Sequence, residues 1–432
     1  MKKTILTIVV CAVSVVAQAQ WLRVWQNGES TRYAISEAPS IPYASAGSTL
    51  TVGSDTYTTS AIDSITIVNP VIITWSGTSA TVDIPDSAEG ITATVTGGDV
   101  VINNANVVSE QEFILKGTGT GSLTYNGTFK CKFHLAGVSL TSTNGAAFNI
   151  QCGKRIDLIL EAGSDNSFTD AAGGTQKAAL NCQGHLEIAG GGSLTVTGKT
   201  NHALRSKEYL LLKKTTGAIT INGAVADGIH CGEYFQMNGG AITISGTGSD
   251  GLQVETDASS TEELNGQFLM TGGSIDVTMS AQDSKGIRLD SDPLDATITP
   301  NMQLLDGTVN VNLTSTALGS KAIASDGNFT IGSAATEPTV TVAVAAGVYT
   351  DPATEEENRA TGLKAGLTLT IAGGTTTVSA TGAKSRGVRA ATLTATGGSL
   401  TVTNTGAKSQ GIKLDNAFVG GQGGTVSGTF KY

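Results

Sequence analysis

The sequence is poor in aromatic and charged residues, and it lacks several patterns that mark common protein classes. Aromatic residues make up 5% of the 432 positions and charged residues 14%, both low for a soluble enzyme. No G-X-Y period is present, which excludes a collagen triple helix in spite of 55 glycines. No WD or kelch signature is present, so a propeller is not indicated. The abundant residues are Gly, Ala, Val, Ile, Thr and Ser, a mixture that favours strands and turns over helices.

The N-terminus predicts export. Lys2 and Lys3 precede an apolar run at 5–16, and Ala17-Gln18-Ala19 is an A-x-A signal, so we expect cleavage between Ala19 and Gln20. No later span follows, which predicts a secreted, periplasmic or cell-surface protein without membrane insertion. The formal net charge is −10, and it becomes −12 when Lys2 and Lys3 leave with the signal peptide. A chain this acidic is a poor candidate for nucleic-acid binding.

Two units repeat along the second half of the chain. The first unit reads G-G-x-h-T-h-T/S, where h is hydrophobic, with close variants at 191–197, 239–245, 272–278 and 397–403. The second reads G/A-h-x-h and occurs at 203–206, 228–231, 251–254, 286–289, 387–390 and 411–414. Leu204 and Ile229 are 25 residues apart, and Ile229 and Leu252 are 23 apart. Longer gaps hold polar insertions at 255–266 and 290–300.

This period predicts a β-solenoid. Each repeat contains about three short strands with period-2 alternation, separated by Gly-rich corners, and successive repeats would stack by parallel pairing. Leu204, Ile229, Leu252 and Ile287 should then point inward in successive turns. Residues 20–70 lack the repeat. Strands at 21–25 and 62–67 around an Asn27-Gly28 turn predict a small β module or cap ahead of the solenoid at 71–432.

The same register bears on the cysteines. There is no CxxC, so a zinc site has little support, and an even number of cysteines beyond the signal peptide permits two disulfides. Cys182 and Cys231 fall in one inward column two turns apart, about 9.6 Å, which is too far for a disulfide. We therefore predict that these two thiols are not bonded to each other.

Several segments resemble a known family. They lie at 135–140, 144–148, 160–163, 165–170, 178–180, 192–198 and 227–229. The chain resembles secreted carbohydrate-binding proteins with a right-handed parallel β-helix, related in fold to pectate lyases, some of which are similar to calcium-containing binders of polygalacturonate. The resemblance implies an all-β, right-handed parallel β-helix of about 23–25 residues per turn. Asp227 and Asp250 keep the family's acidic residue before the G-I step. Other residues replace it in further repeats: His202, Lys285, Lys321, Arg386 and Gln410.

The outward position of the second unit is rich in cations. The predicted column is Arg205, His230, Gln253, Arg288, Ala324, Lys364, Arg389 and Lys413. A basic stripe on an acidic protein suits a regularly charged anionic polymer such as a polyuronate. We predict that Arg205, His230, Arg288, Lys364, Arg389 and Lys413 contact the polysaccharide. The competing explanation is that long Lys and Arg side chains keep this β face from associating with other chains and pair with acidic neighbours.

Two further groups of residues are candidates. His185, Tyr209 and Tyr234 should share a corner, where the tyrosine rings could stack on sugars. Carboxylates beside them and in the next insertions could bind calcium as a cofactor: Glu208, Glu233, Asp290, Asp292 and Asp295. Half-covered corner tyrosines and solvated acidic loops are the alternatives.

Three classes of function remain open. We predict a monomeric, non-catalytic binder of an acidic, polyuronate-like polysaccharide. A polysaccharide lyase, with Arg205 or Arg288 as base, is one alternative, although nothing in the sequence singles out either residue and no G-D-D, G-H-G or R-I-K signature of the hydrolases is present. An adhesin or structural solenoid is the other, since a fold shared with enzymes is no evidence of catalysis.

Overall fold

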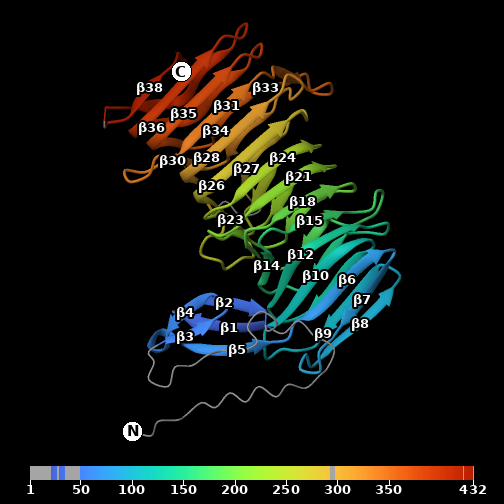
Figure 1. Cartoon of the computed structure of the whole chain (residues 1–432). Helices are drawn as coiled ribbons and strands as arrows, with labels where there is room; N and C mark the ends of the chain where they lie inside the picture. Colours follow the sequence, from blue (N-terminus) through green and yellow to red (C-terminus); the bar gives the residue numbers. More distant parts are fainter. Residues whose placement is uncertain (1–20, 27–28, 35–48, 292–296, 422, 432) are drawn as a thin grey trace. The chain divides into compact units, whose positions relative to one another are not determined.

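The computed structural model describes residues 21–26, 29–34, 49–291, 297–421 and 423–431 (Figure 1). Internal contacts divide the chain into two units, one of residues 1–71 with 83–89 and one of residues 72–82 with 90–432. The predicted signal peptide, its Ala19–Gln20 cleavage site and the Asn27-Gly28 turn lie outside the described residues. Within the described part, no helix is long and apolar enough to cross a membrane.

The smaller unit is an antiparallel β structure. Strands β1 (Trp21–Gln26), β2 (Glu29–Ala34) and β5 (Ser64–Val68) form a sheet in the order β2-β1-β5. Strands β3 (Thr49–Val52) and β4 (Asp55–Thr58) form a separate hairpin, followed by a 3-10 turn at Thr59–Ala61. The core is built from Leu22, Val24, Tyr33, Leu50, Val52 and Tyr57. The strands expected at 21–25 and 62–67 correspond to β1 and β5, while a capping role for this unit stays a prediction.

The larger unit consists of three parallel ladders, which share their longest strands. The first ladder carries the G/A-h-x-h repeats. Its strands are β9 (Asp99–Asn104), β11 (Ser122–Gly127), β13 (Phe148–Gln151), β16 (Ala178–Cys182), β19 (His202–Ser206), β22 (Ile229–Cys231), β25 (Leu252–Glu255), β27 (Lys285–Asp290), β29 (Lys321–Ser325), β34 (Thr361–Ala365), β36 (Arg386–Asn404), β37 (Gln410–Val419) and β39 (Phe430–Lys431).

The second ladder runs beside it. Its strands are β6 (Val71–Gly77), β10 (Gln111–Thr120), β12 (Cys131–Thr141), β14 (Ile156–Leu160), β17 (Leu186–Ala189), β20 (Leu210–Leu212), β23 (Tyr234–Met237), β26 (Gln267–Met279), β28 (Asn301–Leu313), β30 (Asn328–Ile331) and β35 (Thr368–Ala380), followed by β36 and β37.

The third ladder carries the G-G-x-h-T-h-T/S repeats. It adds β15 (Asp165–Thr169), β18 (Ser193–Gly198), β21 (Ala218–Ala224), β24 (Ala241–Thr247), β31 (Thr339–Val344) and β38 (Thr425–Ser427) to parts of β12, β26, β28, β35 and β36. Strands β7 (Ser79–Asp83) and β8 (Ile91–Thr96) precede the ladders, and β8 pairs antiparallel with β9. A hairpin of β32 (Val348–Thr350) and β33 (Glu357–Arg359) stands apart as its own two-stranded sheet.

The predicted right-handed parallel β-helix with 23–25 residues per turn needs correction. Strands such as β26 and β28 run through a corner without a break and pair in two ladders, so the ladders join into one 32-stranded sheet. The pairings support an all-β, barrel-like fold with a closed barrel of ten parallel strands and further strands, rather than a regular solenoid. The repeat length also varies, since Leu252 pairs with Ile287 and Ile323 with Leu363.

The inward columns follow the alternation of the sequence. Leu204 pairs with Ile229, Ile229 with Leu252, and Leu252 with Ile287, and all four side chains are fully buried. Their predicted inward orientation is therefore confirmed. Because period 2 places every second residue on one face, burying this column sends the residue between two inward positions to the outer surface. That geometry positions the polar residues described below.

The cysteine prediction is also confirmed. Cys182 pairs with Ser206 and Ser206 with Cys231, so the two thiols are separated by one strand within the same column. Cys131, Cys152, Cys182 and Cys231 are all buried and free. In this column cysteine occupies the place that serine or valine takes in other repeats, which is the role of a small buried side chain.

Candidate functional site: a basic cavity on the first ladder

The outer face of the first ladder carries two parallel columns of polar side chains, which we call the basic strip from β27 to β37. One column is Arg288, Ala324, Lys364, Arg389 and Lys413, on five successive strands. The other stands three residues earlier on the same strands and is Lys285, Lys321, Thr361, Arg386 and Gln410. Parallel pairing repeats these positions about every 4.8 Å, so the cations of neighbouring strands lie close together.

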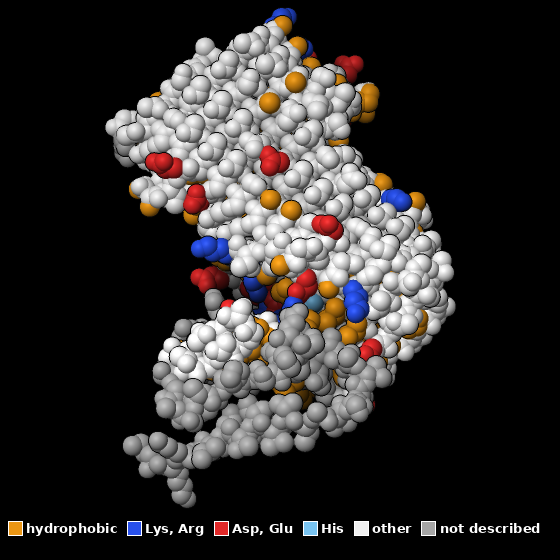
Figure 2. All heavy atoms as spheres, viewed as in Figure 1, with side chains coloured by type: hydrophobic (Ala, Val, Ile, Leu, Met, Phe, Trp, Pro, Cys, Tyr) orange, Lys and Arg blue, Asp and Glu red, His pale blue; other side chains and the backbone are white. Residues whose placement is uncertain are grey.

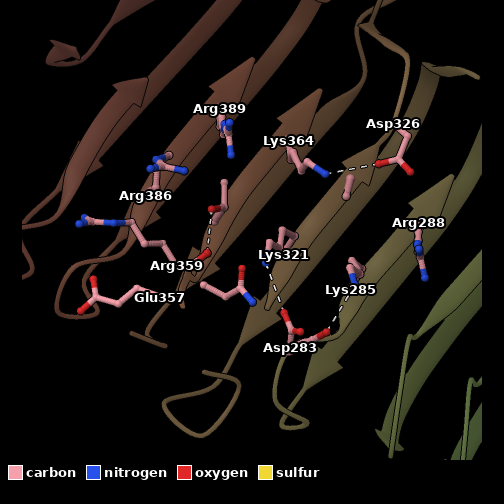
Figure 3. A pocket seen from close by; sticks show the side chains of 13 residues that line it. Asp283, Lys285, Arg288, Lys321, Asp326, Glu357, Arg359, Lys364, Arg386 and Arg389 are labelled. Atoms are coloured by element: carbon pink, nitrogen blue, oxygen red, sulfur yellow. Dashed lines mark hydrogen bonds and ion pairs between the residues drawn. The ribbon is translucent and has the colours of Figure 1, made fainter. Parts of the chain in front are cut away.

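A cavity of about 450 Å³ opens on this strip, which we call the basic cavity (Figure 3). Seven cations line it: Lys285, Arg288, Lys321, Arg359, Lys364, Arg386 and Arg389. Only three acidic residues line it: Asp283, Asp326 and Glu357. The larger part of the lining comes from β27, β29, β34 and β36, and the remainder from β33, from the turn before β27 and from the residue after β29. The site therefore combines a rigid ladder with one side formed by a hairpin.

Two small residues explain why the strip is hollow at this point. Ala324 occupies a position that Arg or Lys takes on neighbouring strands, and Thr361 does the same in the second column. Both side chains are buried in the floor. After β29 the chain passes through β30 and β31 and returns to the first ladder through the β32–β33 hairpin. This hairpin brings Glu357, Asn358 and Arg359 to the edge of the hollow.

Several cations of the cavity are not neutralised by the protein. Lys321 lies 3.6 Å from Asp283, Lys364 lies 3.4 Å from Asp326, and Arg288 lies 3.3 Å from Asp250. Figure 3 shows Lys321 and Lys364 directed at their acidic partners. Among the described residues, by contrast, no carboxylate forms an ion pair within 4 Å with the charged groups of three further cations: Lys285, Arg359 and Arg386. Lys285 and Arg359 donate to backbone carbonyls and Arg386 to the Gln410 side chain.

Like-charge crowding changes the acid–base behaviour of two of these groups. Burial, with the positive charges of Lys285 and Lys364, lowers the pKa of Lys321 below its usual range. Burial, with Arg389 and Arg359, lowers the pKa of Arg386 to about 10. A cation whose pKa is lowered in this way is held in its charged form at a free-energy cost. An anion bound among these groups would remove part of that cost.

The structure places the predicted contact residues in one continuous column. Arg205 pairs with His230, His230 with Gln253 and Gln253 with Arg288, and the column then runs on to Lys413. Arg288, Lys364 and Arg389 line the basic cavity, whereas Arg205, His230 and Lys413 lie on the same column outside its lining. Arg205 donates to Asn181, and burial lowers its pKa.

Four cations of the cavity were not among the predicted contacts. Lys285, Lys321 and Arg386 were visible in the sequence, where they replace an acidic residue before the G-h-x-h step. The signal that could have identified them is that a base replaces an acid at the same repeat position three times. Arg359 lies in the hairpin insertion and had no repeat signal.

His185, Tyr209 and Tyr234 form the aromatic corner on the second ladder. His185 stands one residue before β17, Tyr209 one residue before β20, and Tyr234 is the first residue of β23. The rings of Tyr209 and Tyr234 stack at 4.6 Å and 18°, and those of His185 and Tyr209 lie 4.4 Å apart. Tyr209 donates to Glu187, and Tyr234 is only 8% exposed. The faces of the Tyr209 ring are therefore in contact with its two neighbours. Sugar stacking on Tyr209 and Tyr234 stays a prediction, and the accessible parts of the Tyr209 ring are its edges.

The carboxylates predicted for calcium lie in separate places. Glu208 lies 2.9 Å from His185, and burial raises the pKa of nearby Glu233. Asp290 pairs with Arg288 at 2.5 Å, while Asp292 and Asp295 lie outside the described residues. Within the described part of the chain, the one cluster with three potential ligand atoms close enough to share an ion is His202, Asp227 and His230. Calcium binding stays a prediction.

Charge is unevenly distributed over the larger unit. Figure 2 shows a face of this unit that is mostly white, the colour of neutral polar side chains and backbone, with scattered acidic and basic residues. Threonine dominates the outward column of the third ladder, where Thr195, Thr220 and Thr243 are paired in succession. The concentration of seven cations at the basic cavity is therefore a local feature of the first ladder.

These features describe an all-β protein with a cavity on a parallel ladder that is lined mainly by cations. The chain belongs to the family of carbohydrate-binding domain-containing proteins, whose model matches residues 96–411 and so includes all of the basic cavity. A comparison with curated proteins found no match. Among solved structures, a polysaccharide lyase-like protein from C. thermocellum, in a gadolinium derivative, is similar at 21% identity. The match covers 62% of this chain and 98% of that chain, with a TM-score of 0.48.

Proposed function

We propose that the protein binds an acidic polysaccharide without cleaving it, with the basic cavity as the principal contact site. The observation that carries the proposal is the excess of seven cations over three carboxylates around one hollow, where Lys285, Arg359 and Arg386 have no acidic partner within 4 Å among the described residues. A carbohydrate with regularly spaced carboxylates supplies the missing charges, and the guanidinium groups offer paired donors to each carboxylate.

The arrangement of the strip favours a polymer over a single charged sugar. Arg389 pairs with Lys413, and Lys413 pairs with Lys431, so the cationic column continues beyond the cavity. Each exposed charge pair contributes only about 0–1 kcal/mol. Several contacts along one chain add through effective concentration, since the first contact holds the next uronate near its partner.

The chemistry of Arg386 agrees with binding without cleavage. A lyase needs a group that accepts a proton at the working pH, with its pKa near that pH. The pKa of Arg386, about 10, leaves this guanidinium protonated at neutral pH, where it serves as a donor and a charge. Export, a monomeric state and calcium binding accompany this proposal as further predictions.

The test is calorimetry of the full mature chain against polygalacturonate and a neutral glucan, at low and high salt. We expect binding to polygalacturonate only, with an affinity that falls steeply with salt because screening weakens every ionic contact together. The variants are Lys285→Gln and Arg386→Gln. Each should lower the affinity up to about fivefold, which corresponds to about 1 kcal/mol.

Lys116→Gln is the matched control, because it removes one exposed positive charge from β10, outside the cavity. Equal and salt-insensitive binding to both glycans would contradict the proposal and favour the aromatic corner. Appearance of unsaturated-sugar absorbance would favour a lyase. Absence of binding to either glycan would favour an adhesin or a structural protein.

A further inference from the structure

A second polar cluster lies on the same ladder, three strands before the basic cavity. His202 begins β19, His230 is the middle residue of β22, and Asp227 stands three positions before His230. Arg205 pairs with His230, so the position three residues before Arg205 lies beside the position three residues before His230. The ladder register therefore places His202 next to Asp227. His230 points outward from the middle of β22 and lies beside both side chains.

The ligand atoms of the three side chains converge. Oδ2 of Asp227 lies 3.1 Å from Nδ1 of His202 and 3.1 Å from Nδ1 of His230. The two imidazole rings are stacked 4.4 Å apart at 24°, and all three ligand atoms lie within 4.8 Å of one another. Two imidazole nitrogens with one carboxylate oxygen suit zinc, copper or nickel, whereas calcium and magnesium prefer an all-oxygen set.

The hydrogen bonds of the cluster depend on where the two imidazoles carry their protons. When Nδ1 of His202 and Nδ1 of His230 carry hydrogens, both donate to Oδ2 of Asp227 at 3.1 Å. When the two nitrogens are unprotonated, their lone pairs and the carboxylate oxygen are available to one ion. The same three atoms can therefore hold protons or a metal ion, and binding of the ion releases protons.

The surroundings orient the ligands. Oδ1 of Asp227 accepts the backbone N–H of Asp250 at 3.0 Å, which fixes the carboxylate and leaves Oδ2 directed at the histidines. Oε2 of Glu255 lies 3.6 Å from Nε2 of His230, the position of an outer carboxylate behind a metal-bound imidazole. The side chains of His202, Asp227 and His230 are 14%, 5% and 15% exposed, so the cluster is enclosed but open at one edge.

We propose that Nδ1 of His202, Oδ2 of Asp227 and Nδ1 of His230 form a three-ligand site for a divalent transition-metal ion such as Zn²⁺. Three protein ligands leave one position of a tetrahedral ion free for water or for an oxygen of a bound molecule. The site is independent of the basic cavity, since it uses none of the residues that line it.

The test uses the full mature chain after treatment with a chelator. Calorimetry with Zn²⁺ should show one saturable site per chain, and an excess of Ca²⁺ should not displace the ion. With Cu²⁺, electron paramagnetic resonance should show coupling to two nitrogens. His202→Gln and His230→Gln should each weaken Zn²⁺ binding by more than about 100-fold, because loss of an outer carboxylate alone costs about 10–100-fold.

Two further variants make the assignment specific. Glu255→Gln keeps all three ligands and should weaken binding by about 10–100-fold. His185→Gln is the matched control, because His185 lies on the second ladder beside Glu208 and should retain full affinity. Absence of a saturable Zn²⁺ or Cu²⁺ site overturns the proposal, and so does unchanged affinity in correctly folded His230→Gln, with circular dichroism as the check of folding.

Discussion

At the scale of single residues, Lys321 is a cavity cation whose charge depends on pH. Burial lowers its pKa, so Lys321 loses its proton at a lower pH than an ordinary lysine. Deprotonation removes a positive charge, so binding of an anionic glycan should weaken between neutral and alkaline pH, before an ordinary lysine loses its charge. We expect a loss of up to about fivefold, since one charge pair contributes up to about 1 kcal/mol.

The check is calorimetry against polygalacturonate across this pH range, with Lys321→Arg beside the wild type. The guanidinium stays charged, so the variant should show a flatter profile. A wild-type affinity that does not change between these pH values would contradict the role given to Lys321.

Ala324 is the second residue with a specific consequence. Its side chain forms part of the cavity floor, in the column between Arg288 and Lys364. Ala324→Gln fills the hollow without changing the net charge, so affinity for polygalacturonate should fall about tenfold, or about 1.4 kcal/mol. Ala343→Gln is the control, because Ala343 is exposed on β31 of the third ladder. Equal affinities of the two variants would show that the hollow shape is not used.

At the scale of elements, the β32–β33 hairpin can be tested by removal. It pairs only within itself, so the ladder pairing of β29 with β34 does not depend on it. The backbone carbonyl of Gly347 accepts N–H bonds from both Gly319 and Ala360, so the two ends of the insertion already meet. Replacing residues 348–359 by two glycines should keep the fold and lower polygalacturonate affinity at least about tenfold, because Arg359 is lost with one side of the cavity.

The measurement is calorimetry together with thermal unfolding. Shortening the insertion at residues 258–263, which does not line the cavity, serves as the control. Full affinity in the variant without the hairpin would show that the strip on the ladder binds alone.

The register of the elements was predictable, and the cavity was not. Alternation with period 2 fixes which residue of each G-h-x-h strand is buried, so the column from Arg205 to Lys413 followed from the sequence. The hollow depends on two small residues, Ala324 and Thr361, that become neighbours only once β29 pairs with β34 across an insertion. No local pattern marks that insertion as a hairpin that returns to the strip. The His202, Asp227 and His230 cluster was missed because His202 and Asp227 were interpreted only as residues of the position before the G-I step, and His230 only as a member of the outward column.

At the scale of the whole molecule, the all-β class and the parallel stacking were predictable from composition and repeats, whereas the class of fold was not. The prediction assumed separate strands between Gly-rich corners, in repeats of about 23–25 residues with insertions in some of them. Long strands such as β35 and β36 cross corners instead, and insertions lengthen several repeats. Corner glycines permit a sharp bend but do not require a break in pairing, so the sequence pattern alone could not distinguish the two arrangements.

The four buried thiols allow local opening of the larger unit to be measured by their reactivity. Burial raises the pKa of each thiol, that of Cys182 to about 12, so almost no reactive thiolate is present in the closed state. Alkylation of Cys131, Cys152, Cys182 and Cys231 should therefore be slow in native buffer and fast in denaturant, as followed by mass spectrometry. The four alkylation rates would measure how often the structure around each cysteine opens locally. No introduced probe is needed for this measurement. Labelling at the denatured rate in native buffer would contradict this burial.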